Sequence, residues 1–161
     1  MFLARLVSIM LSVKNVLVLF GGVSTEHEVS IVSALQVMNA LKEAGFGVLP
    51  GYIAKDGRWL LGDQRLLKPE FYKELSNVAK AGRPFLLPAD RQVGLLTRGL
   101  LGYGGTMEQV DVVFPVFHGK NGEDGTVQGL LELMNIPFVG CGVTSSAVGV
   151  DKYLAKKVAR D

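Results

Sequence analysis

The sequence DVVFPVFHGKNGEDGTVQGLLELM, residues 111–134, predicts a buried strand, a polar loop and a helix in direct succession. Residues 111–117 are almost continuously apolar, which is typical of a strand buried on both faces of a parallel sheet. Residues 126–134 have the apolar spacing of a helix. The loop between them holds a histidine, two carboxylates and three glycines. Loops at the carboxyl ends of strands in α/β sheets are where ligands bind, so the stretch predicts a fold class and a site together.

The polar residues of this loop allow two interpretations each. Glu123 and Asp124 directly precede the predicted helix, where the helix dipole favours negative charge, so they are either helix-start residues or catalytic groups. His118 follows a strand and is either a structural hydrogen-bonding residue or a ligand contact. The residues alone leave these alternatives open.

A strand–helix–strand unit is predicted upstream of this region. Residues 16–20 form an apolar run of strand length that ends in two glycines, and residues 48–53 form a second such run. Between them, residues 28–44 predict a helix, with Ser24 or Thr25 as its N-cap and Gly45 just beyond its C-terminus. The apolar positions that set the helical spacing are Val29, Val32, Leu35, Val37, Met38 and Leu41.

The remaining segments are less regular. An Asp-Gly pair within residues 55–62 predicts a small hairpin, and residues 69–80 predict a helix. Residues 82–105 are rich in glycine and proline and predict loops and short strands, whereas residues 145–161 predict one helix. Strand runs that alternate with helical patterns predict an α/β fold, with a parallel sheet flanked by helices. We expect that sheet to contain residues 16–20, 48–53 and 112–116 and a short strand near Phe138.

The bulk composition restricts the class of protein. The 161 residues are 48% hydrophobic and 20% charged, as in a globular α/β protein with one core. The net charge is only +2, so the composition shows no excess of basic residues of the kind that indicates nucleic-acid binding. Cys141 is the single cysteine, so an internal disulfide is excluded, which suits a reducing cytoplasm, and no zinc-type Cys/His spacing occurs. No apolar stretch is long enough to span a membrane.

The first twelve residues are predicted to lie outside the core. They are apolar with one arginine, but no small-residue cleavage site follows, so a signal peptide is disfavoured. We expect residues 1–12 to be a disordered leader, or the result of a start codon assigned too early, with Met10 as the true start.

Three motifs carry a resemblance to a known family. The loop HGKNGEDGTVQG, residues 118–129, resembles a signature of the D-alanine–D-alanine ligases. The stretch FGGVSTEHEVS, residues 20–30, resembles the family's first strand, glycine turn and first helix. The segment from PFVGCG, residues 137–142, to Asp151 and Lys152 resembles the exit from the family's N-terminal domain, although Gly149-Val150 stands where a methionine is expected before the aspartate. The motifs lie in the family's order and cover the chain from about Val13 onward.

The resemblance implies a Rossmann-like pre-ATP-grasp domain and a set of site residues. It implies that Glu26 binds the ammonium of the first D-alanine, a contact that a carboxylate makes through charge-assisted hydrogen bonds, and that His118 lies beside the same substrate. Both are therefore expected in the catalytic site. Val29 is expected either to contact the D-alanine methyl group or to belong to the core, and Lys152 either to contact ATP phosphate or to be a solvated helix residue. His27 is expected at the surface.

The resemblance also implies a function and a domain organisation. Residues 13–142 would form the N-terminal substrate-binding domain, and residues 143–161 the helical start of a linker toward an ATP-grasp region that this chain does not contain. The whole enzyme would be a cytoplasmic homodimer that uses ATP and Mg²⁺ to join two D-alanines for peptidoglycan, without binding nucleic acid or membrane. The Mg²⁺ ligands would lie outside this chain, and the chain alone would be inactive.

Two alternative functions remain at this stage. The first is a stand-alone ligand-binding α/β module, but the glycine turn at residues 21–24 lacks the G-x-G-x-x-G spacing of a dinucleotide site and no Walker-type Gly-Lys-Ser/Thr occurs. The second is a related ligase, such as a D-alanine–D-lactate ligase, whose choice of second substrate depends on residues that this chain does not contain. Cys141 lies between glycines with no base placed near it, so we interpret it as a packing residue rather than a nucleophile.

Overall fold

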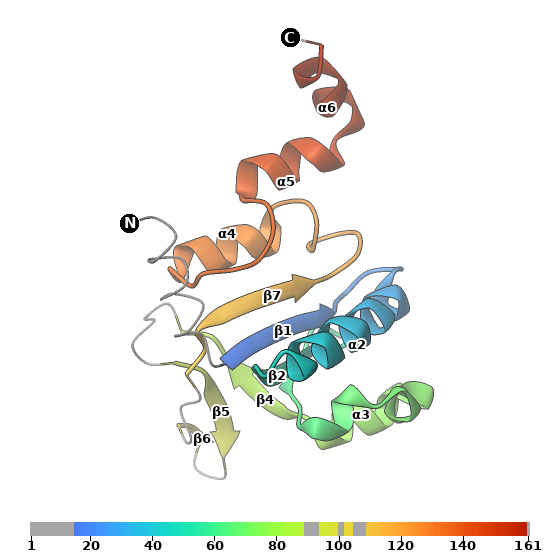
Figure 1. The fold of residues 1–161 in the computed structure, drawn as a ribbon, viewed down its shortest axis with the longest axis vertical. Coiled ribbons are helices and arrows are strands. Elements are labelled where there is room, and N and C mark those ends of the chain that lie inside the picture. Colours follow the sequence, from blue (N-terminus) through green and yellow to red (C-terminus); the bar gives the residue numbers. More distant parts are fainter. Residues whose placement is uncertain (1–14, 89–93, 100–101, 105–108, 161) are drawn as a thin grey trace.

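Three parallel strands form the centre of the fold. β1 (Asn15–Gly21) lies between β2 (Gly47–Ile53) and β7 (Val112–Val116) and pairs in parallel with both (Figure 1). The strands expected at residues 16–20, 48–53 and 112–116 are confirmed. The computed structural model describes residues 15–88, 94–99, 102–104 and 109–160.

Helices cover both faces of these central strands. The side chains of Val16, Val18 and Phe20 pack in one hydrophobic cluster with buried residues of α2 (His27–Glu43). The alternate residues Leu17 and Leu19 pack in a second cluster with buried residues of α4 (Thr126–Leu133). Because side chains of a strand alternate between faces, one continuous apolar run supplies both cores.

The outer part of the sheet is antiparallel, and this corrects the expectation of a parallel sheet. β3 (Trp59–Leu61), β4 (Arg83–Leu86), β5 (Leu96–Gly99) and β6 (Gly102–Tyr103) extend the sheet beyond β2 in the order β6-β5-β4-β3-β2-β1-β7. Each pair from β2–β3 to β5–β6 is antiparallel. The short connection from β2 to β3 can only reverse the chain, because a parallel neighbour needs a long crossover. The connection from β3 to β4 is long and contains η1 (Gln64–Leu67), η2 (Pro69–Lys73) and α3 (Leu75–Ala81), yet it also ends in an antiparallel pair.

The connections near this outer part are partly as predicted. The hairpin expected at residues 55–62 is confirmed by the pairing of β2 with β3, with Gly57 in the turn at φ +85°. The strand expected near Phe138 is reduced to one parallel bridge between that residue and Val113. Residues 82–105 contain short strands, as expected, within their described part.

The helix predicted at residues 28–44 is confirmed as α2, but its cap and its buried face differ from the prediction. No side chain caps the helix, because the Ser24 hydroxyl instead accepts a hydrogen bond from the Glu26 N–H. Val29 and Val32 are 52% and 57% exposed. The buried positions are His27, Ser30, Ile31, Ala34 and Met38. Gly45, at φ +88°, ends the helix as predicted.

Two other predicted helices are interrupted. Residues 69–80 form a 3₁₀ turn, η2 (Pro69–Lys73), followed by α3 (Leu75–Ala81), with η1 (Gln64–Leu67) before them. The helix expected at residues 145–161 is two helices, α5 (Val143–Val150) and α6 (Lys152–Val158). They lie together at one end of the molecule (Figure 1).

Asp151 causes the second interruption. Its backbone is extended, and its side chain accepts hydrogen bonds from the N–H groups of Tyr153 and Leu154, so it ends one helix and caps the next. No residue of α5 or α6 is buried.

None of the helices in the described part of the chain combines the length and the apolar character that a membrane-spanning helix needs. The leader expected at residues 1–12 lies outside the described residues.

Candidate functional site at the ends of β1 and β7

The turn after β1 is held from within by a buried histidine. His27 is fully buried, with Nδ1 2.7 Å from the Gly22 carbonyl oxygen and Nε2 3.0 Å from the Tyr52 hydroxyl. The expectation that His27 lies at the surface is therefore wrong. Because a carbonyl only accepts, Nδ1 carries the proton and the tyrosine hydroxyl donates to Nε2. Burial, with nearby carboxylates, raises the pKa of Tyr52 from 10.0 to about 12, so that hydroxyl keeps its proton above the ordinary pKa of a tyrosine.

Ser30 joins the ends of the two strands that carry the site. Its hydroxyl accepts a hydrogen bond from the Gly21 N–H of β1 at 2.7 Å and donates to the Val116 carbonyl of β7. The side chain is fully buried, so both backbone groups exchange water for this one hydroxyl. The first turn of α2 is thereby fixed against the carboxyl ends of β1 and β7.

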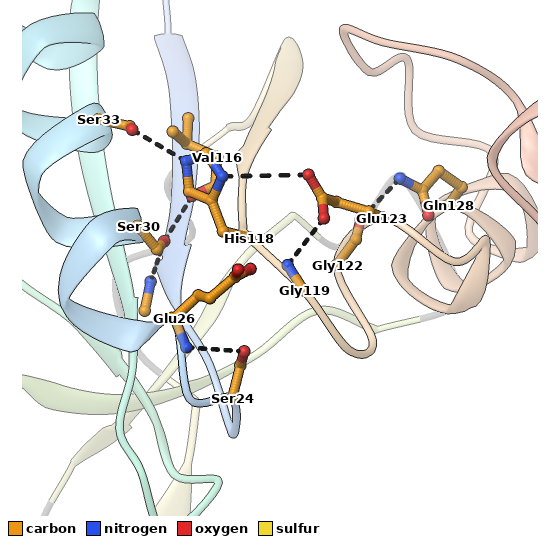
Figure 2. A network of polar contacts seen from close by, with 11 residues as sticks. Ser24, Glu26, Ser30, Ser33, Val116, His118, Gly119, Gly122, Glu123 and Gln128 are labelled. Carbon is orange, nitrogen blue, oxygen red and sulfur yellow. Dashed lines mark hydrogen bonds and ion pairs between the residues drawn. The ribbon is translucent and has the colours of Figure 1, made fainter. Parts of the chain in front are cut away.

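Glu26 lies where the turn after β1 meets the loop after β7. Figure 2 shows its carboxylate pointing toward the segment that contains His118 and Gly119. Gly119 has φ +77°, and a Cβ built on it would lie 2.9 Å from Glu26 Oε2 and 2.7 Å from Ser24 Oγ. The two turns therefore approach each other at a distance that only glycine permits.

His118 lies at the same edge and has a protein neighbour at each ring nitrogen. Nε2 is 2.9 Å from the Ser33 hydroxyl on α2. Nδ1 is 4.0 Å from Glu123 Oε1, and the histidine side chain is 34% exposed. Figure 2 shows the ring between α2 and the loop after β7, on the same side as Glu26. The structure thus brings the two predicted catalytic residues to one edge of the sheet.

The two loop carboxylates have structural partners. Glu123 accepts a hydrogen bond from the Gly119 N–H at 2.8 Å, and Asp124 accepts from the N–H groups of Asn121 and Thr126. Burial alone would raise the pKa of Asp124, but these hydrogen bonds outweigh it and hold the pKa below its ordinary value. Between the two interpretations of Asp124, the contacts favour that of a helix-start residue.

An open cleft of about 770 Å³ lies between the two turns, over the ends of the strands. It carries charge of both signs. The carboxylate is Glu26, and the ammonium groups are Lys55, which pairs with Glu28 beside the cleft, and Lys120. A zwitterion matches a cleft with one carboxylate and two ammonium groups. The lining residues are Val23, Ser24, Thr25, Glu26, Lys55, Gly119 and Lys120.

Several residues singled out in the sequence do not line this cleft, and His118 is among them. Val29 is exposed on α2, so its interpretation as a core residue is wrong. Lys152 is exposed at the start of α6, and Cys141 is exposed in the loop before α5. Among the described residues, no group of three or more histidine, cysteine, aspartate or glutamate side chains could hold a metal ion.

Sequence analysis missed several residues that shape the site. Ser33 and Lys55 contact or line it from α2 and from the end of β2, and Lys120 lies in the loop signature itself. Ser33 is 85 positions from its partner His118, so no local pattern joins them. Lys120 directly follows the His-Gly pair of the loop signature, so its place in that motif could have indicated it as a site residue.

Comparison with known proteins identifies relatives of this arrangement. A family profile described as "D-ala D-ala ligase N-terminus" matches residues 15–141. A D-alanine–D-alanine ligase from Geobacillus kaustophilus is 46% identical over 142 residues, which are 88% of this chain and 37% of that protein. One from Caldicellulosiruptor bescii is 47% identical over 145 residues, 90% of this chain and 38% of that protein. The chain thus spans less than two fifths of the length of these relatives.

Solved structures agree with this match. The D-alanine–D-alanine ligase of Coxiella burnetii superposes with a TM-score of 0.73 at 38% identity, covering 91% of this chain and 41% of that one. VanG D-Ala:D-Ser ligase of Enterococcus faecalis superposes with a TM-score of 0.75 at 38% identity and the same coverage. The mixed sheet described above is therefore the architecture of the N-terminal region in this group of ligases.

Proposed function

The chain belongs to the D-alanine–D-alanine ligase family, and from this premise we propose that it forms the first-substrate site of an ATP-dependent ligase that makes D-alanyl-D-alanine for peptidoglycan. The observation that carries the proposal is the Glu26 carboxylate, which packs against Gly119 in a cleft that also holds two lysines. In this proposal Glu26 accepts hydrogen bonds from the D-alanine ammonium, and the substrate carboxylate is thereby oriented for reaction.

The reaction proposed for the whole enzyme has two steps. A carboxylate oxygen of the first D-alanine attacks the γ-phosphorus of ATP, the bond to the ADP oxygen breaks, and an acyl phosphate forms. The amine nitrogen of the second D-alanine then attacks the carbonyl carbon, the C–N bond forms, phosphate leaves and the amine loses a proton. The contribution of this chain is to position the first substrate, and such positioning supplies a large part of the rate enhancement of many enzymes.

His118 and Val29 complete the proposed first-substrate site. In this proposal the imidazole of His118 donates a hydrogen bond to the first D-alanine. The ring lies on the same side of the loop as Glu26, although it is not among the residues that line the cleft. Val29 is exposed on the first turn of α2, where an apolar side chain is available to contact the D-alanine methyl group once other parts of a ligase enclose it. Lys152, exposed on α6, is proposed to contact ATP phosphate. The Mg²⁺ ligands are proposed to lie outside the described residues.

One comparison admits a second substrate other than D-alanine. VanG, a D-Ala:D-Ser ligase, is as similar in identity and coverage as the D-alanine–D-alanine ligase of Coxiella burnetii. A second candidate function is therefore ligation of D-alanine to D-serine. Product analysis with equal concentrations of D-alanine and D-serine, on a full-length ligase that contains this chain, distinguishes the two.

A titration of the ¹⁵N-labelled chain tests the first-substrate site. D-alanine is expected to shift the amide signals of Gly119 and Lys120, which line the cleft beside Glu26. Propionate, which lacks the ammonium group, and D-alanine with Glu26→Gln are expected to give much smaller shifts. The matched control is Glu43→Gln at the other end of the same helix, about 25 Å away for 17 residues. Equal shifts with D-alanine and propionate, or shifts confined to residues far from the cleft, would refute the proposed ammonium contact.

A further inference from the structure

The Ser33 hydroxyl has no role in the function proposed above, yet it contacts a residue of that site. It lies on the second turn of α2, 2.9 Å from His118 Nε2. On the other side of the ring, Nδ1 faces Glu123 Oε1 at 4.0 Å, beyond hydrogen-bonding distance. The imidazole thus lies between a hydroxyl, which can donate or accept, and a carboxylate, which only accepts (Figure 2).

Glu123 and Ser33 both act on the tautomer of the neutral ring, the first through its charge and the second through a hydrogen bond. The Gly119 N–H holds the carboxylate through its Oε2, 2.8 Å away, so Oε1 stays turned toward the ring. A lone pair on Nδ1 would face this negative charge and be repelled, whereas an N–H at Nδ1 would be attracted. With the proton on Nδ1, Nε2 is an acceptor, and the Ser33 hydroxyl is the donor within reach.

We propose that Ser33 is a positioning residue that donates to His118 Nε2 and thereby holds the proton of the neutral imidazole on Nδ1. That N–H then points toward the Gly119–Glu123 loop, whose first two residues line the cleft, and it stays free to donate to a carboxylate or acyl-phosphate oxygen of the ligand. When the ring takes up a second proton, the hydroxyl turns and accepts from Nε2–H. The orientation of the ring is thus kept in both charge states.

This role deepens the proposed first-substrate site and rests on it, but the tautomer is measurable without any substrate. The chain has two histidines, so a ¹⁵N-histidine spectrum of the 161-residue chain contains two rings. His27 serves as an internal reference, because its Nδ1 donates to the Gly22 carbonyl at 2.7 Å. At a pH at which both rings are neutral, each is expected to show a protonated Nδ1 and an unprotonated Nε2.

Substitution of Ser33 separates positioning from a general structural role. In Ser33→Ala only the bias from the half-exposed Glu123 carboxylate remains, so the Nε2–H share of His118 is expected to rise, while His27 keeps its signals. Ser33→Thr retains the hydroxyl and is expected to restore the Nδ1–H form. Ser76→Ala, an exposed serine on α3, is the matched control and is expected to change neither ring.

Three results would overturn the proposal. The first is a wild-type His118 protonated on Nε2, a measurement that needs no variant to fold. The second is an Nδ1–H share that is undiminished in Ser33→Ala. The third is a D-alanine titration that moves the Gly119 amide signal but leaves the His118 Nδ1 signal unchanged. Failure of D-alanine to bind at all would instead count against the first-substrate site, while the tautomer measurement would still decide the role of Ser33.

Discussion

At Gly119 the missing side chain allows the carboxylate of Glu26 to reach the loop after β7. The glycine combines a left-handed backbone, at φ +77°, with close approach to two side chains on the other turn. Either requirement alone favours glycine, because other residues in this conformation cost about 1–2 kcal/mol. The position therefore couples the stability of the loop to the geometry of the cleft.

Gly119→Ala is expected to reduce both stability and ligand binding. The free energy of unfolding should fall by about 1–2 kcal/mol from backbone strain, and the new Cβ should displace Glu26 and weaken the D-alanine-induced shifts. Gly45→Ala is the matched control, because Gly45 has a similar φ of +88° but no atom within 4 Å of a built Cβ. Both variants should lose stability in urea unfolding, and only the first should lose binding. Retention of binding in Gly119→Ala would contradict the proposed contact.

Tyr52 predicts how stability depends on alkaline pH. Burial raises its pKa in the folded chain from 10.0 to about 12. Between these values the unfolded chain has lost the proton and the folded chain has kept it, so the free energy of unfolding should fall as the pH rises from 10 to 12. Tyr52→Phe should show a shallower fall in urea titrations over this range. At neutral pH it should be less stable by about 1–3 kcal/mol, because His27 Nε2 loses its donor. If the free energy of unfolding fell equally steeply with pH in the wild type and in Tyr52→Phe, the link between the Tyr52 pKa and stability would be refuted.

Local sequence patterns predicted which helices and strands exist better than they predicted the direction of each strand, the buried face of each helix or the residues at which an element ends. The central strands and α2 follow from apolar runs and spacing, because such patterns depend on neighbours in the chain. The buried face of α2 does not follow from such patterns. Ser30 is buried because it hydrogen-bonds the ends of β1 and β7, whereas the apolar Val29 is exposed. Likewise, His27 is buried because a donor arrives from β2, 25 positions away. These outcomes depend on tertiary contacts that no window of sequence contains.

The loop before α4 predicts a measurable contribution of Asp124 at the scale of one element. Its carboxylate accepts from two backbone N–H groups, so Asp124→Ala should destabilise the chain by about 1–2 kcal/mol, whereas Asp124→Asn, which retains an acceptor, should lose less. Because its folded pKa lies below the ordinary value of 3.8, this stability is present above that pH and is lost as the pH falls through the folded pKa. Urea unfolding at neutral and acid pH measures both effects. Equal stabilities for the three proteins at neutral pH would contradict this role.

At the scale of the whole molecule, the mixed sheet separates two parts of the fold. The parallel strands β2, β1 and β7 carry the candidate site at their carboxyl ends, whereas the antiparallel strands extend the sheet away from it. The sequence predicted the first part from long apolar runs and the antiparallel β3 from the Asp-Gly turn before it. It missed the directions of β4, β5 and β6, because residues 82–105 contain only short runs. The family motifs predicted the positions of Glu26 and His118 at one edge, and the pairing of β1 with β7 explains why both lie at that edge.

The chain alone is expected to form no dipeptide from ATP and D-alanine. It spans less than two fifths of the length of its curated relatives, and the Mg²⁺ ligands are proposed to lie outside its described residues. Phosphate release and dipeptide formation should therefore stay at background, with a full-length relative as the positive control. Phosphate release that depends on D-alanine would contradict this expectation.

The central claim is that Glu26 binds the ammonium of the first D-alanine, and kinetics of Glu26→Gln test it most directly in a full-length ligase that carries this chain. A hydrogen bond to a charged group contributes about 1.5–3 kcal/mol, so kcat/KM for the first D-alanine should fall about ten- to a hundredfold. The KM for ATP and the melting temperature should hardly change, and Glu43→Gln should behave as the wild type. If Glu26 only begins a helix, stability should fall slightly through the dipole interaction, and unchanged D-alanine kinetics would remove it from the site.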